Sequence, residues 1–143
     1  MNNSLKSICL AILCVFAFQT LEAKPKKVVQ KPVYMIGVGF SLVDSMVFIT
    51  DMQLVDSITI EKKTKFLVDR QLYSFQFQRY LEAAYKGGPY VPSVFFSPNR
   101  KKMERKYLSL HKRYVQSKDM RMILVDISQF RFKSEKYIDE TTE

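Results

Sequence analysis

Basic side chains are concentrated in one segment of the sequence, residues 100–118. The segment holds eight lysine and arginine residues and a single acidic residue, Glu104, so it carries +7 of the chain's formal net charge of +9. Like charges at this density repel one another, and an unpaired set favours contact with an anionic partner. A solvated face that only keeps the protein soluble is the alternative interpretation. The residues that we expect to contact an anionic partner are Arg100, Lys101, Lys102, Arg105, Lys106, Lys112 and Arg113.

Few other side chains could support catalysis. His111 is the only histidine, and the sequence offers neither a serine nucleophile elbow nor a set of zinc ligands beside it. We therefore expect His111 to lie half-packed at the edge of the core, and we expect no metal or cofactor. Aspartates are the other candidates, because converging carboxylates can exchange protons or bind a cation. A small carboxylate-dependent hydrolase or cation-dependent enzyme is thus the alternative function, and its candidate residues are Asp44, Asp51, Asp56 and Asp126.

Hydrophobic periodicity predicts the elements that position these groups. Bulky apolar side chains alternate over residues 33–42 and continue over 46–50, which predicts two paired strands. Residues 73, 77, 80, 81 and 84 share one face of a helix within 69–88. Residues 103, 107, 110 and 114 share one face of a second helix within 100–118, with Leu108, His111 and Val115 alongside. Apolar runs at 94–96 and 122–127 predict two further strands, and residues 58–60 have the alternation of a short third one.

The predicted order is β-β-α-β-α-β, an α+β domain with a small mixed sheet and both helices packed on one face. The strand at 94–96, the basic helix and the strand at 122–127 would form one parallel crossover. Gly37 and Gly39 lie on the opposite face of the first strand from its bulky residues, where another element can pack closely. Asp69 can cap the first helix, and Gly87-Gly88 can end it.

The first 23 residues have the layout of a secretory signal peptide. Lys6 precedes an unbroken apolar run of 11 residues, Ile8–Phe18, and a more polar stretch then ends on Ala23. A spanning helix needs roughly 20 apolar residues, so cleavage after Ala23 is favoured over an uncleaved anchor. Both cysteines lie in the apolar run, and the chain that remains would have to fold without a disulfide in an oxidising compartment. We expect the protein to be exported to the periplasm or cell envelope.

Composition divides the remainder of the chain into three regions. Residues 24–32 are rich in lysine and proline and predict a basic tether. Residues 33–133 predict a single α+β domain, because a chain of this length can bury one core and not two. Residues 134–143 predict an acidic, flexible tail.

Several short motifs of the predicted domain resemble one group of proteins. They are Gly37–Ser41 with Asp44-Ser45, Phe48–Asp51, Lys63–Leu67, Arg70 with Tyr73-Ser74, and Phe95-Phe96 before the lysine-rich helix. In this order they are similar to short exported proteins of Bacteroides-type bacteria. The resemblance covers most of the domain and implies an envelope location in a two-membrane bacterium. It implies no activity, substrate or catalytic residue.

Together these observations favour an exported binding module over an enzyme. The helix at 100–118 would contact an anionic lipid, an anionic glycan or an acidic protein, including peripheral contact with a membrane. Nucleic acid is not expected as the partner, because the chain is predicted to be exported and contains no nucleic-acid-binding motif.

Overall fold

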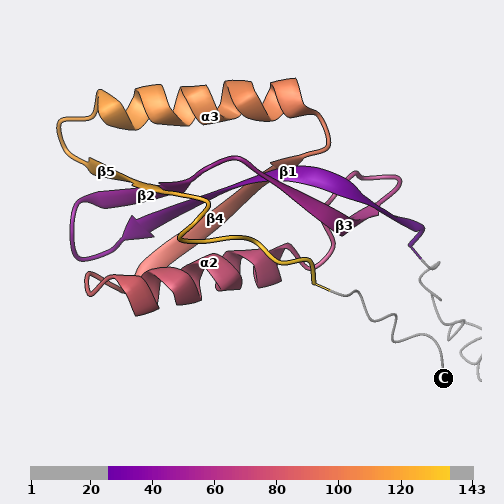
Figure 1. Ribbon diagram of the computed structural model, residues 1–143, viewed down its shortest axis with the longest axis horizontal. Coiled ribbons are helices and arrows are strands. Elements are labelled where there is room, and N and C mark those ends of the chain that lie inside the picture. Colours follow the sequence, from indigo (N-terminus) through magenta and orange to yellow (C-terminus); the bar gives the residue numbers. More distant parts are fainter. Residues whose placement is uncertain (1–25, 136–143) are drawn as a thin grey trace, which may run out of the picture.

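Five strands and two helices lie within residues 26–135, the part of the chain that the computed structural model describes (Figure 1). The predicted signal peptide and most of the predicted tail lie outside these residues. The order β-β-β-α-β-α-β adds the third strand to the predicted series, and the α+β class with a mixed sheet is confirmed. The elements are β1 (Val28–Ser41), β2 (Met46–Thr50), β3 (Gln53–Glu61), α2 (Arg70–Ala84), β4 (Tyr90–Ser97), α3 (Arg100–Val115) and β5 (Arg121–Val125).

Strand β1 is the centre of the sheet. β4 pairs with it antiparallel along one edge, over residues 34–41. β3 and β2 pair antiparallel with successive parts of the other edge of β1. Residues 34–35 of β1 pair with both β3 and β4, and residues 38–40 of β1 pair with both β2 and β4. β5 then runs parallel to β2. β4 and β5 therefore point the same way, as the predicted crossover requires, but β1 and β2 lie between them.

The predicted tether at 24–32 is wrong for most of its length, because β1 already begins at Val28. Val28 and Val29 pair with the end of β3, and Val29 packs against the core. Lysines and prolines give this stretch a polar composition, but β-branched valines favour a strand. Pro32, which has no N–H to donate, lies where the register between β1 and β3 shifts.

The two helices cover opposite faces of the sheet (Figure 1), so the prediction that both pack on one face is wrong. α2 packs with Met35 in one core cluster, whereas α3 packs with the next residue, Ile36, in a second. Successive strand residues point to opposite faces, so β1 contributes to both clusters. The topology gives the reason. The chain crosses the sheet from β3 to β4 through α2 and returns from β4 to β5 through α3, and two crossovers of the same hand in opposite directions place their helices on opposite faces.

Helix α2 lies close against β1 at the two glycines. A Cβ atom at Gly37 would lie 3.0 Å from Phe77 Cδ1, and one at Gly39 would clash with Leu81 Cδ1. The predicted close approach on the glycine face is therefore confirmed. It brings the helix backbone nearer to the sheet than side chains on this face would allow.

The buried face of α2 follows a helical period. Tyr73, Phe77 and Leu81 are buried, whereas Phe75 is 54% exposed. The helical spacing therefore prevails, although Tyr73, Phe75 and Phe77 also alternate as strand residues do. The helix begins directly after Asp69, as predicted, but Asp69 has a φ of 53° and makes no side-chain cap hydrogen bond. The predicted end at the glycines is wrong, because the helix already ends at Ala84.

Residues 126–135 pass below the sheet on the side of α2 (Figure 1). Phe130 and Phe132 are buried there, with ring centroids 4.9 Å apart. Gln53 of β3 fixes this segment, because its Nε2 donates to the Phe130 carbonyl and its Oε1 accepts from the Phe132 N–H, both at 2.9 Å. The first two residues of the predicted tail, Ser134 and Glu135, also donate hydrogen bonds to the domain.

Candidate functional site

Helix α3 is fixed to the sheet along its inner side. Asn99 caps its N-terminus, with Oδ1 accepting from the Lys102 N–H at 3.0 Å. Met103 and Leu110 are buried in the cluster formed with β1 and β2, and Tyr107 and Tyr114 are partly buried beside them. Because this side holds the helix in place, the opposite side is free to face a partner.

The first turn of α3 carries cations where a helix favours anions. The N-terminus of a helix has a partial positive charge, so acidic residues stabilise it and basic residues do not. α3 has no acidic residue in its first turn, and Arg100, Lys101 and Lys102 occupy it. A sequence that works against local stability in this way is a sign of function.

Two of the seven predicted site residues have partners inside the protein. Arg100 Nε lies 2.7 Å from Glu104 Oε1. Lys106 is half-buried, and its Nζ lies 4.1 Å from the ring centroid of Phe95, a cation–π contact. These two residues therefore contribute less to an external contact than the sequence predicts.

The other five predicted residues remain together on the outer side of the helix. All five are exposed, and none forms an ion pair with another residue in the range 26–135. At a rise of 1.5 Å per residue they extend along about 18 Å of the helix axis. They are Lys101, Lys102, Arg105, Lys112 and Arg113.

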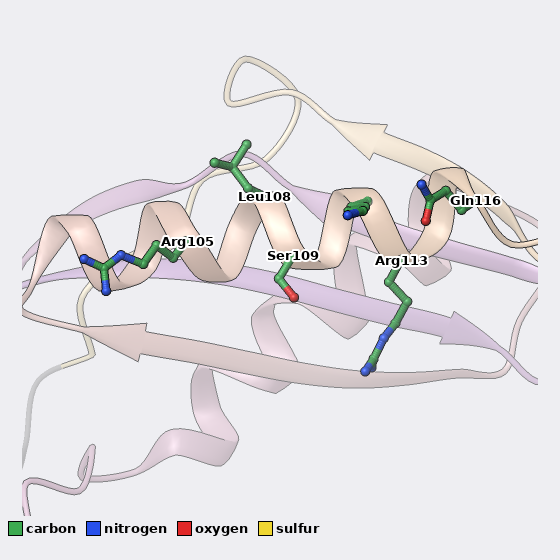
Figure 2. A pocket seen from close by; sticks show the side chains of 6 residues that line it. Arg105, Leu108, Ser109, Arg113 and Gln116 are labelled. Atoms are coloured by element: carbon green, nitrogen blue, oxygen red, sulfur yellow. The ribbon is translucent and has the colours of Figure 1, made fainter.

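The outer side of α3 is shallow and open to solvent (Figure 2). Ser109 and Arg113 project to one flank of it and Leu108 to the other, with Arg105 between them. With Lys112 and Gln116 these side chains line a depression of about 510 Å³. Guanidinium, ammonium, hydroxyl and amide groups can donate to phosphate, sulfate or carboxylate oxygens. An open surface of this kind suits an extended anionic partner and does not enclose a small molecule.

Two aliphatic residues lie on this face although the sequence places them beside the buried stripe. Leu108 is 66% exposed and Val115 is 60% exposed. Leu108 is five residues after Met103 and two before Leu110, a spacing that turns it away from their side of the helix. The 3.6-residue period of a helix, applied strictly, therefore predicts that Leu108 is exposed. Ser109 and Gln116 were missed because they carry no charge.

His111, Asp51 and Asp126 each contact neighbouring residues in a way that supports the fold. His111 is half-buried, with its ring centroid 5.7 Å from that of Tyr107, so its predicted place at the edge of the core is confirmed. Asp51 and Asp126 follow the neighbouring parallel strands β2 and β5. Asp51 accepts from the Ile127 N–H at 3.0 Å. Hydrogen bonds from the hydroxyl and N–H of Ser128 hold the pKa of Asp126 below its ordinary value.

Asp51 and Asp126 lie close enough for their side chains to interact, but the other two candidate aspartates do not join them. Asp44 lies in the turn between β1 and β2, and Asp56 lies on an exposed position of β3. Within residues 26–135 no three His, Cys, Asp or Glu side chains come close enough to hold a metal ion. The structure therefore brings together the basic residues of α3. Of the four candidate aspartates it brings together Asp51 and Asp126, whose hydrogen bonds hold the turn after β5.

None of the helices within the described residues is long and apolar enough to cross a membrane. Comparison of the chain with family models, curated proteins and solved structures gives no match. The function is therefore inferred from the chemistry of the α3 face.

Proposed function

We propose that this protein is an exported binding module of the cell envelope. The outer face of α3 contacts an anionic envelope component, which is a lipid, a glycan or an acidic protein. The observation that supports this is the set of five exposed cations on α3 that form no ion pair within residues 26–135. The predicted signal peptide at 1–23 and the resemblance to exported proteins support the location.

Electrostatics supports contact over a purely solubilising role. Lys101 and Arg105 are four residues apart on one side of the helix, where like charges cost about 0.2–0.5 kcal/mol per pair. Near an anionic surface each lysine or arginine gains about 1 kcal/mol. Five such residues gain about 5 kcal/mol, which corresponds to an affinity increase of between about three and four orders of magnitude. An anionic partner therefore converts a local cost into binding.

A charge-reversal pair of variants tests this function. The first variant carries Lys101→Glu, Arg105→Glu and Lys112→Glu, and Lys106 is kept because it packs on Phe95. The control carries Lys62→Glu, Lys63→Glu and Lys65→Glu, three exposed lysines between β3 and α2 that give the same change in net charge. Retention on envelopes isolated from the producing cell is measured as the salt concentration rises.

The α3 variant is expected to lose retention at low salt, while its thermal unfolding stays close to that of the wild type. The control is expected to stay bound until salt shortens the Debye length from about 10 Å to about 3 Å. Equal loss in both variants would mean that net charge alone causes retention. Full retention of the α3 variant would refute the proposed function.

A further inference from the structure

Five exposed side chains form one straight stripe along the outer side of α3. Successive members are four, three, four and three residues apart, so each lies about one turn from the next on the same side of the helix. Three of them are cations and two are aliphatic. In order they are Lys101, Arg105, Leu108, Lys112 and Val115.

The two aliphatic members are not needed to hold the helix on the sheet. Met103 and Leu110 on the opposite side already bury α3 against β1 and β2. Leu108 and Val115 are more than half exposed and lie about 10 Å apart along the helix axis. Apolar side chains placed between cations therefore suit a partner that offers both negative charge and an apolar interior.

A bilayer surface that contains anionic lipids has this combination. Its phosphates lie at the surface and its acyl chains begin a few ångströms below. Lysine and arginine can keep their charged ends at the phosphates while aliphatic neighbours enter the boundary with the acyl chains. The shallow, open shape of the α3 face also fits a flat partner, whereas an acidic peptide would be expected to occupy a groove.

We infer that the anionic partner of α3 is a lipid bilayer surface, which rests on the proposed function. The helix lies along the surface with Lys101, Arg105 and Lys112 at lipid phosphates, and with Leu108 and Val115 inserted at the acyl boundary. The protein itself stays outside the hydrocarbon core, because the buried side of α3 remains on its own sheet. Such a contact is peripheral and reversible.

Vesicle binding tests this inference. The probes are vesicles of pure phosphatidylcholine and vesicles of phosphatidylcholine and phosphatidylglycerol in equal parts. The protein is used in the form that accumulates in the producing cell, with its N-terminus read by mass spectrometry. Binding to the pure phosphatidylcholine vesicles gives every contribution that does not need lipid charge. The difference between the two vesicle types then measures the charged contact.

The variant Leu108→Ser with Val115→Ser removes the aliphatic pair and keeps every charge. Its control is Leu42→Ser with Val43→Ser in the turn between β1 and β2, where the same two residue types are 65% and 70% exposed. Partial burial of two aliphatic side chains is worth about a tenfold change in affinity. The α3 variant should therefore bind mixed vesicles about tenfold more weakly, and the control should bind as the wild type does.

Retention on immobilised heparin separates this inference from the proposed function, because heparin is anionic but has no apolar interior. The aliphatic variant should be retained on heparin like the wild type. The inference would be overturned if the aliphatic variant bound mixed vesicles as tightly as the wild type does. It would also be overturned if the Leu42 and Val43 control lost as much affinity for these vesicles as the aliphatic variant. Retention on heparin through α3 without binding to mixed vesicles would overturn it and leave the proposed function standing. Failure to bind both heparin and the mixed vesicles would overturn the inference, and retention of the α3 charge-reversal variant on isolated envelopes would still decide the proposed function.

Discussion

Gln53 connects the last described segment of the chain to the sheet, and its replacement by methionine has a predictable cost. The side chain is 2% exposed, donates to the Phe130 carbonyl and accepts from the Phe132 N–H. Methionine has a similar volume and shape but can form neither hydrogen bond. The variant Gln53→Met therefore leaves two buried backbone groups without their partner while it preserves packing.

Each buried polar group that loses its partner costs about 1–3 kcal/mol. Two such groups predict a loss of about 2–6 kcal/mol in the free energy of unfolding, out of a total of about 5–15 kcal/mol for a domain. For a chain of this size that is a fall in Tm of roughly 10 °C or more. The two lost hydrogen bonds lie on the face of the sheet that α2 covers, and α3 lies on the other face. Binding through α3 should therefore persist at temperatures below the lowered Tm.

Chemical denaturation gives the global loss, and two local measurements give its origin. Hydrogen exchange should lose protection at the Phe132 N–H, and trypsin should cleave sooner after Arg131 and Lys133, which are exposed on either side of it. The control Gln71→Met makes the same chemical change at an exposed position of α2. Wild-type stability and protection in Gln53→Met would refute the assignment of this residue as the connection.

Three further predictions concern the core. Gly39→Ala places a Cβ against Leu81 and should lower the free energy of unfolding by about 1–3 kcal/mol in denaturant titration; a stabilised variant would contradict the close packing of α2. Thr50→Val removes the acceptor of the Gly37 N–H, 2.8 Å away, and should cost about 1–3 kcal/mol by the same assay, whereas a neutral result would contradict that role. Burial raises the pKa of Tyr80 to about 12. The folded state therefore holds its proton longer than the unfolded state, whose tyrosine pKa is about 10, and stability should fall as pH rises through this window. Tyr80→Phe should make the fall shallower in unfolding titrations, and an unchanged slope would contradict this origin.

The order of elements apart from β3 could be predicted from local patterns of apolar residues. Helix α3 and strands β1 and β2 follow from the spacing of their apolar residues alone. The strand at Val28 and Val29 could not be separated from a tether, because its lysines and prolines hide two valines whose partners in β3 are 30 or more residues away. The faces on which the helices lie depend on the direction of each crossover, which no single segment encodes.

The site could be predicted in composition but not in detail. The charge of residues 100–118 shows in the sequence, and so does the buried stripe that fixes the helix. The partner of Lys106 could not be predicted, because Phe95 comes from β4 and reaches it only once the helix packs on the sheet. The exposure of Leu108 and Val115 can be predicted from their positions in the 3.6-residue period of the helix.

Crosslinking in intact cells tests whether the outer face of α3 contacts an anionic envelope component. A photoreactive amino acid replaces Ser109, which is exposed in the middle of the outer face of α3, or Ala83, which is exposed on α2 across the sheet. After illumination the attached molecules are identified by mass spectrometry. If α3 contacts an anionic envelope component, that component should be attached at position 109 and absent at position 83. The same products at both positions, or only cytosolic products at position 109, would contradict such a contact.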